Sequence, residues 1–252
     1  DVSGSSGLLT SIQNDINDIK ATLSLNIDAF ARIRVSEPFT LGDYKHIYGI
    51  DEHFFDNTSG GGTVTYNGSA SCCVLSVSGA YSQVIHQTKL YHHYSPGKSQ
   101  HILSSFCFGE AKPGIRKRTG YFDDNNGIFF EQGADGILRW TIRNQVDSSG
   151  ESVVQNEWNI DKCNGSGSSG FNVDLSKTQL VFIDFQWLGV GRVRVGFVHN
   201  GTYVYAHDFY HSNVLPYVYM RTPNLPVRCE ITNTSSSVIN ASMDQICSTV
   251  VS

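Results

Sequence analysis

The chain has 252 residues, of which 40% are hydrophobic and only 16% are charged. This balance predicts an ordered globular protein with a sizeable core and excludes a disordered tail. Lys and Arg number 18 against 23 Asp and Glu, which gives a net charge of -5. Without a basic face to neutralise phosphates, we expect no nucleic-acid partner. No apolar run reaches the roughly 18 residues that a bilayer requires, so we expect no membrane insertion.

Residues 1–27 differ from the rest and form the first predicted unit. They begin with Asp1 and not with Met, which suggests a segment or a processed product of a longer chain. After a Gly- and Ser-rich lead, apolar residues recur at alternating spacings of three and four, the heptad pattern of a coiled coil. The residues of this seam are Leu9, Ile12, Ile16, Ile19 and Leu23.

The residue types in the seam predict the number of helices in the coil. Leu or Ile at position a with Ile at position d favours trimers or tetramers over dimers. Asp15 falls at g and Lys20 at the following e, a pair that can bridge neighbouring parallel helices. We therefore predict a homotrimer held by residues 1–27. The alternative is a single amphipathic helix lying on the protein's own core, although such helices usually carry a wider apolar stripe.

From residue 28 onward the hydrophobic period changes from 3.5 to two, which is typical of strands. Short segments rich in β-branched and aromatic residues alternate with Gly, Asn, Asp, Ser and Pro clusters. We predict an all-β domain over 28–252, an antiparallel two-sheet sandwich of the jelly-roll or concanavalin-like kind. Its predicted strands are 62–66, 71–77, 83–91, 101–108, 127–132, 137–144, 180–188, 190–199, 202–209 and 227–232.

Asn-Gly and Asp-Gly pairs predict tight two-residue hairpins, because both central residues of such turns take positive φ. The clearest hairpin spans 192–208, with Val193, Val195 and Phe197 on one strand face and Arg192, Arg194 and Gly196 on the other. The Ser/Gly stretch 163–170 is predicted to be an exposed loop within the same domain. The predicted turns are Asn67-Gly68, Asn126-Gly127, Asp135-Gly136, Asn164-Gly165 and Asn200-Gly201.

The six cysteines match no C-x-x-C pair, and the adjacent Cys72 and Cys73 would face opposite sides of a strand. We expect reduced, mostly buried thiols, as in a protein made in a reducing cytosol. The remaining cysteines are Cys107, Cys163, Cys229 and Cys247.

Three short patterns resemble cofactor or metal sites. The GxGxxG string at 165–170 leads into no helix, so we expect no dinucleotide. The Asp/Asn cluster at 123–127 is ordinary turn material and lacks the later Glu of an EF-hand loop. His207 and His211 would share one strand face and could meet on a trimer axis, but stacking or surface histidines are commoner. We therefore predict no metal, no cofactor and no catalytic residues.

Aromatic residues near loop edges are candidates for stacking on sugars. We single out Tyr91, Tyr94, Tyr217 and Tyr219, with sandwich core as the alternative role. The one basic cluster, at 116–118, is interpreted as a solvated strand end.

Several motifs resemble a family of virion structural proteins found in tailed phages, including marine and cyanobacterial ones, and in large algal viruses. The resemblance implies a particle component with a β-sandwich body and supplies no catalytic residues. The heptads before Ile27 lie outside it. The motifs that carry it are 27–41, 118–122, 126–132, 184–197, 230–233 and 245–249, of which 184–197 is the longest and most specific.

These observations together predict a non-enzymatic virion structural protein, a homotrimeric fibre or decoration module on a virus particle. Its expected partners are itself and other virion proteins, after assembly in the host cytoplasm. A closed trimer would turn weak sites on each head into avid attachment. The alternative is a lectin-like adhesin that binds host-surface polysaccharide. A glycan depolymerase is a remote alternative, because paired carboxylates need no recognisable motif.

Overall fold

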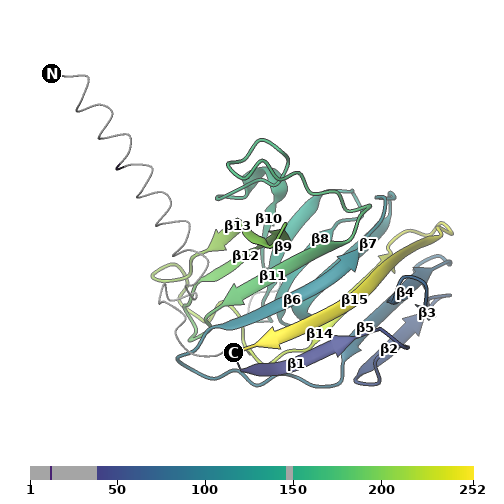
Figure 1. Ribbon diagram of the computed structural model, residues 1–252, viewed down its shortest axis with the longest axis horizontal. Helices are drawn as coiled ribbons and strands as arrows, with labels where there is room; N and C mark the ends of the chain where they lie inside the picture. The colour runs from purple at the N-terminus through teal and green to yellow at the C-terminus, as the bar shows by residue number, and fades with distance from the viewer. Residues whose placement is uncertain (1–11, 13–38, 146–149) are drawn as a thin grey trace.

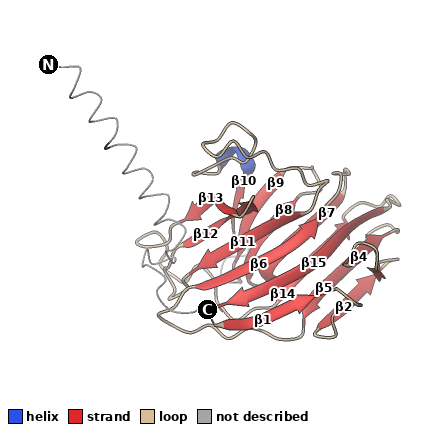
Figure 2. Ribbon diagram, in the orientation of Figure 1, coloured by secondary structure: helices blue, strands red, loops and turns tan. Residues whose placement is uncertain are grey.

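The computed structural model describes residues 12, 39–145 and 150–252, which include two antiparallel β-sheets packed face to face (Figure 1). Strands account for nearly all the regular structure, and a short 3-10 helix, η1 (Gln155–Glu157), follows one of them (Figure 2). This is the predicted antiparallel two-sheet sandwich. Within the described part of the chain, no helix combines the length and the hydropathy that crossing a membrane requires.

The first sheet has eight strands in the order β13-β12-β11-β6-β15-β4-β3, with β1 pairing with β15 as well. The long C-terminal strand β15 lies near its middle and contacts β6, β4 and β1. The strands are β1 (Thr40–Lys45), β3 (Thr63–Asn67), β4 (Cys72–Val77), β6 (Gln100–Cys107), β11 (Gln179–Phe185), β12 (Val193–His199), β13 (Thr202–Phe209) and β15 (Ala241–Val251).

The second sheet has seven strands in the order β10-β9-β8-β7-β14-β5-β2. Its strands alternate between side chains that enter the sandwich and side chains on the outer face, as the period of two requires. The strands are β2 (Phe54–Ser59), β5 (Gln83–Thr88), β7 (Ile115–Phe122), β8 (Gly127–Gln132), β9 (Leu138–Arg143), β10 (Glu151–Val154) and β14 (Val227–Asn233).

The core between the sheets is rich in aromatic rings. Phe197 on β12 is fully buried and lies edge-on to Phe130 of β8, with ring centroids 5.2 Å apart. Trp140, Trp158 and Phe171 also contact Phe197. Large buried rings contribute much of the apolar area removed from water, so this cluster holds the two sheets together.

All ten predicted strands are present, with shifts of a few residues at their ends. Five strands were not predicted: β1, β2, β7, β10 and β15. In β7 the residues Arg116, Lys117 and Arg118 hide the apolar alternation, and in β2 polar residues follow Phe54 and Phe55. The interpretation of 116–118 as a solvated strand end is wrong, because Lys117 is buried and the two arginines pack on the outer sheet face.

The Asn200-Gly201 hairpin is confirmed, since both residues have positive φ, 50° and 78°. Its strand faces are also as predicted, with Val193, Val195 and Phe197 in the core. The other four turns differ, because their Asn or Asp residue does not take positive φ. Their side chains instead accept backbone N–H groups, as Asn67 does from Ser69. This bond substitutes for the backbone geometry of a two-residue turn.

The loop 163–170 belongs to the sandwich domain, as predicted, and Asp161 organises it. The two carboxylate oxygens of Asp161 accept the N–H groups of Cys163 and Ser169. All six cysteines lie in described residues and are free, and four of them are buried. Cys72 and Cys73 are both buried, and Cys73 belongs to the core between the sheets.

The predicted coiled coil lies almost wholly outside the described residues. This applies to Leu9, Asp15, Ile16, Ile19, Lys20 and Leu23. Ile12 alone among the seam residues is described, as helical and 46% exposed. The homotrimer therefore stays a prediction.

Candidate functional site

The outer face of the seven-stranded sheet carries a charged hollow that we call the arginine basin. Arg116 and Arg118 alternate along β7, Arg228 and Glu230 alternate along β14, and Arg143 ends β9. Because Arg118 and Glu230 face each other in register, these side chains meet on one face. The basin has a volume of about 460 Å³ and is lined by Gln83, Arg116, Arg118, Asp124, Asn125, Arg143, Asn144, Gln145, Arg228 and Glu230.

Glu230 is the centre of the basin, and its side chain is only 2% exposed. Its Oε1 lies 3.3 Å from Arg116 Nη2 and 3.4 Å from Arg118 Nη1, and its Oε2 lies 2.9 Å from Arg228 Nη2. Burial alone would raise the pKa of Glu230, but Arg118, Arg228 and Arg116 outweigh it and hold the pKa below its ordinary value. The carboxylate is therefore ionised and shared among three guanidinium groups.

The arginines are only partly neutralised. Arg118 Nε pairs with Glu131 at 2.5 Å, and Arg228 Nη1 pairs with Asp124 at 2.8 Å. Four arginines thus face three carboxylates. Among the described residues Arg143 forms no ion pair, and its Nη1 donates to the backbone oxygen of Asp123. Burial, together with the nearby Arg118, lowers the pKa of Arg143 to about 10, so Arg143 is the least compensated of the four basin arginines.

Two phenylalanines form the floor beneath the guanidinium groups. Phe122 and Phe129 are fully buried although they belong to the outer face, because the arginines cover them. Arg118 and Arg143 lie over Phe129 at 4.9 and 5.0 Å, and Arg228 lies over Phe122 at 5.2 Å. Stacking holds each guanidinium plane in place without using its N–H donors.

The chemistry of the basin suits an anion that also carries hydroxyl groups. Guanidinium donors recognise carboxylate and sulfate in a bidentate geometry. The exposed amide side chains of Asn125 and Gln145 at the basin can both donate to and accept from sugar hydroxyls. We infer an anion site whose walls provide hydrogen bonds of both kinds.

Two of the four predicted sugar-stacking tyrosines are corrected by the structure. Tyr94 and Tyr219 are 4% and 2% exposed and belong to the core, so neither can face a ligand. Tyr219 stacks on His211, and Tyr94 donates its hydroxyl to the backbone oxygen of Lys98. The alternative role, a place in the sandwich core, is confirmed for both residues. A position near a loop in the sequence does not reveal burial.

The other two tyrosines are exposed and stay predictions. Tyr91 is 46% exposed, and Tyr217 is 38% exposed beside a small cavity of about 70 Å³. Asn144 lines both that cavity and the arginine basin. Asn144 is therefore the one described lining residue that the cavity beside Tyr217 shares with the basin.

The remaining sequence candidates have structural roles. Asp123 Oδ1 accepts the N–H groups of Asn125 and Asn126, which makes 123–127 the turn that was expected. His207 and His211 are both buried, and each is hydrogen bonded within the chain, to Asn159 and Gly191 respectively. Neither histidine is placed for a shared axial ion.

Sequence reasoning missed Arg143, Arg228 and Glu230. The alternation of Arg228 with Glu230, and of Arg116 with Arg118, was a usable signal of a charged strand face. It could not show that these strands are neighbours, because β7 and β14 are far apart in the chain.

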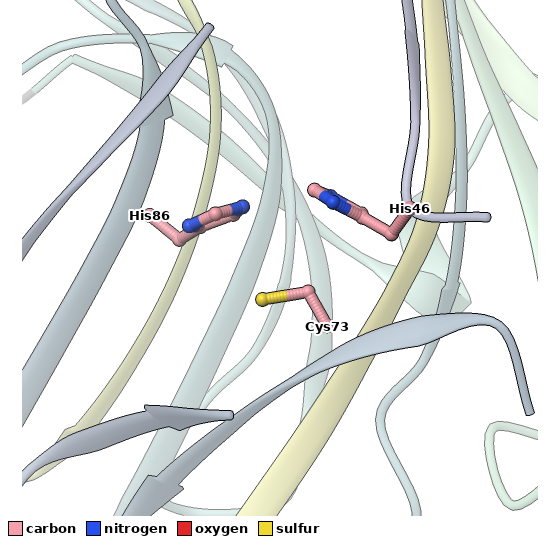
Figure 3. Close-up of side chains that lie close together, drawn as sticks. All are labelled: His46, Cys73 and His86. Atoms are coloured by element: carbon pink, nitrogen blue, oxygen red, sulfur yellow. The ribbon is translucent and has the colours of Figure 1, made fainter. Parts of the chain in front are cut away.

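A second cluster was also missed. His46, Cys73 and His86 bring their side chains together in the interior (Figure 3), and one ligand atom from each lies within 4.8 Å of the other two. The sequence prediction of no metal ligands did not consider this trio, since the three residues share no motif spacing.

No protein-family model matches the chain, and no curated protein matches it. Solved structures share its fold. A protein of unknown function from Shewanella oneidensis MR-1 is similar with a TM-score of 0.51 at 8% identity, over 92% of both chains. The carbohydrate recognition domain of Emp47p is similar with a TM-score of 0.52 at 9% identity, over 87% of this chain and 98% of that chain. These similarities show the class of fold alone, an antiparallel two-sheet sandwich.

Proposed function

We propose that this chain is a carbohydrate-binding module whose arginine basin recognises acidic glycans. The observation that carries the proposal is Arg143, a guanidinium that has no carboxylate partner among residues 39–145 and 150–252 and that lies over Phe129 beside the Glu230 cluster. An anionic sugar can supply the missing negative charge and can bind the nearby amides through its hydroxyls. The module acts by binding and not by catalysis.

The fold supports this proposal. Emp47p uses the same class of sandwich for a domain described as recognising carbohydrate. A fold by itself does not define a function. The proposal therefore depends on the residues of the arginine basin, and the fold is only compatible with carbohydrate binding.

The resemblance to virion structural proteins suggests where such a module would act. We propose a host-attachment role on a virus particle, in which several heads carried by the predicted N-terminal coil bind surface polysaccharide together. Linked weak sites gain affinity through effective concentration, which suits a basin open to solvent.

The test is calorimetric titration with galacturonic acid oligomers and sialyllactose, with maltotetraose as the neutral comparison. We expect binding of one or both acidic sugars, weakened by salt, and no binding of the neutral one. Arg143→Gln should weaken binding about 10- to 100-fold, since a charge-assisted hydrogen bond is worth roughly 1.5–3 kcal/mol.

Arg139→Gln is the matched control. Arg139 lies on the same strand and the same face but pairs with Asp135 at 2.5 Å, outside the basin. Equal binding of acidic and neutral sugars, or equal loss in both variants, would contradict the proposal. Release of reducing ends during the titration would instead support the depolymerase alternative.

A further inference from the structure

We propose that His46, Cys73 and His86 form a buried binding site for a divalent transition-metal ion, with zinc as the expected ion. In the described residues this trio places one nitrogen or sulfur atom from each side chain within 4.8 Å of the others. The site is separate from the arginine basin, because His86 points into the sandwich whereas the basin lies on its outer face.

The three side chains come from both sheets. Cys73 is on β4 of the eight-stranded sheet, and His46 directly follows β1 of the same sheet. His86 is on β5 of the seven-stranded sheet, between the inward-facing Val84 and Thr88. Figure 3 shows the two imidazole rings and the thiol converging on one space. A metal held there would link the two sheets directly.

The two rings present unused nitrogen atoms to this space. His46 and His86 are 1% and 0% exposed. The Nε2 atom of His86 is buried without a hydrogen-bond partner, and that of His46 makes no close hydrogen bond, although the His46 ring interacts with the side chain of Gln245. Other buried side-chain atoms of the described residues also lack a partner, so what indicates a metal is the convergence of these two nitrogens with a thiol. A shared metal ion would satisfy both nitrogens at once.

His86 is already in the tautomer that metal binding requires. Its Nδ1 lies 2.5 Å from the carboxylate of Asp56, which keeps the ring proton on Nδ1 and leaves a lone pair on Nε2. A carboxylate behind a histidine in this way orients the ring and raises its basicity as a ligand.

His46 must change its protonation to bind. Its Nδ1 accepts the backbone N–H of Asp51 at 3.0 Å, so in the neutral ring the proton is on Nε2. Metal binding through Nε2 gives up this hydrogen bond. One neutral hydrogen bond contributes little compared with the affinity of thiolate and imidazole for zinc.

Gln245 offers a fourth ligand atom, an oxygen, beside the trio. It pairs directly with Cys73 in the β15–β4 ladder, is fully buried, and its side chain interacts with the His46 ring. Its Nε2 donates to Ser248 at 3.0 Å, which holds the amide in place. Two imidazoles, one thiolate and a weak oxygen ligand are a donor set for zinc or copper and exclude magnesium and calcium.

Binding needs a small contraction and the loss of one proton. Around a tetrahedral zinc ion the ligand atoms would lie roughly 3.3–3.6 Å apart, so the trio must close by about 1 Å at its widest. Burial raises the pKa of the Cys73 thiol, so this group is neutral until the ion arrives. The thiol proton then leaves to solvent, and one zinc–sulfur and two zinc–nitrogen bonds form.

The experiment uses the full chain, stripped with a chelator and titrated with Co²⁺ as a spectroscopic probe and then with Zn²⁺. We expect one Co²⁺ per chain with the ligand-field bands of a tetrahedral site and a thiolate-to-cobalt charge-transfer band, both removed by one equivalent of Zn²⁺. Zinc should also raise the thermal unfolding midpoint. Cys73→Ser should abolish the charge-transfer band, and His86→Gln should weaken zinc binding at least 100-fold.

Cys72→Ser is the matched control, since Cys72 is adjacent and equally buried but is not part of the trio. It should bind cobalt like the natural chain. Far-ultraviolet circular dichroism identifies variants that fail to fold. If Cys73→Ser or His86→Gln fails to fold, His46→Gln replaces it in the same metal titration. A charge-transfer band that survives Cys73→Ser, or less than 0.1 equivalent of zinc retained at about 10 μM metal, would overturn the site. Glycan binding by the basin does not depend on this result.

Discussion

Glu230 is the residue on which the packing of the arginine basin depends. Its two oxygens pair with Arg116, Arg118 and Arg228 in a setting from which water is nearly excluded. We predict that Glu230→Gln destabilises the fold by about 3–5 kcal/mol, because it leaves buried guanidinium groups without their counter-charge. Urea unfolding measures this loss. Glu131→Gln should cost clearly less, since Glu131 pairs with Arg118 alone, and equal losses would refute the central role of Glu230.

His207 makes the fold sensitive to acid. It is buried, and its Nδ1 accepts the backbone N–H of Asn159 at 3.1 Å. Burial lowers the pKa of His207 in the folded chain below 6.5, so the unfolded chain binds the proton more readily. The stability that depends on neutral His207 is complete above pH 6.5 and is lost as the pH falls through the folded pKa.

The His207→Asn variant tests this dependence, because the Asn oxygen can replace Nδ1 as the acceptor but does not titrate. We predict that its unfolding free energy falls less steeply than that of the natural chain between pH 7 and pH 5. Urea unfolding curves of both chains at pH 7 and at pH 5 measure this difference in unfolding free energy. Identical slopes would show that other buried histidines carry the effect.

At the scale of elements, the β12–β13 hairpin depends on its two-residue turn. Asn200 has φ of 50°, a conformation that Asn tolerates and Ala does not. We predict that Asn200→Ala destabilises the protein by about 1–2 kcal/mol and that Asn200→Gly changes it by a few tenths at most. Thermal unfolding of the three chains compares them, and an equal loss in both variants would point to the Asn200 side chain instead of its backbone.

At the scale of the whole molecule, the predicted coil determines how many heads act together. We predict that the full chain is a trimer in analytical ultracentrifugation and that a chain lacking residues 1–27 is a monomer. The predicted reason is the Leu and Ile seam, which is narrow for a helix packed on its own core and suits packing between identical helices. A full chain that sediments as a monomer would contradict the coil, whereas the sandwich and both sites would be unaffected.

The sequence was sufficient for the fold class because strand formation follows local rules. The hairpin 192–208 shows this best: alternating Val193, Val195 and Phe197 define the buried face, and Asn200-Gly201 defines the turn. Where the outer face of a strand carries charge, as in β7, the alternation of apolar and polar residues did not reveal the strand. Arg116 and Arg118 resembled a solvated end only because their partners are not nearby in sequence.

The sites could not be predicted in the same way. Arg143, Arg228 and Glu230 meet because β9, β8, β7 and β14 lie side by side, and His46, Cys73 and His86 meet because two sheets stack. The sequence alone determined the antiparallel sandwich class, ten of the fifteen strands and the Asn200-Gly201 turn, since alternation and turn chemistry act between near neighbours along the chain. Only the tertiary structure decided which charges and ligand atoms face one another, because strand order and sheet packing follow from burying the whole core at once.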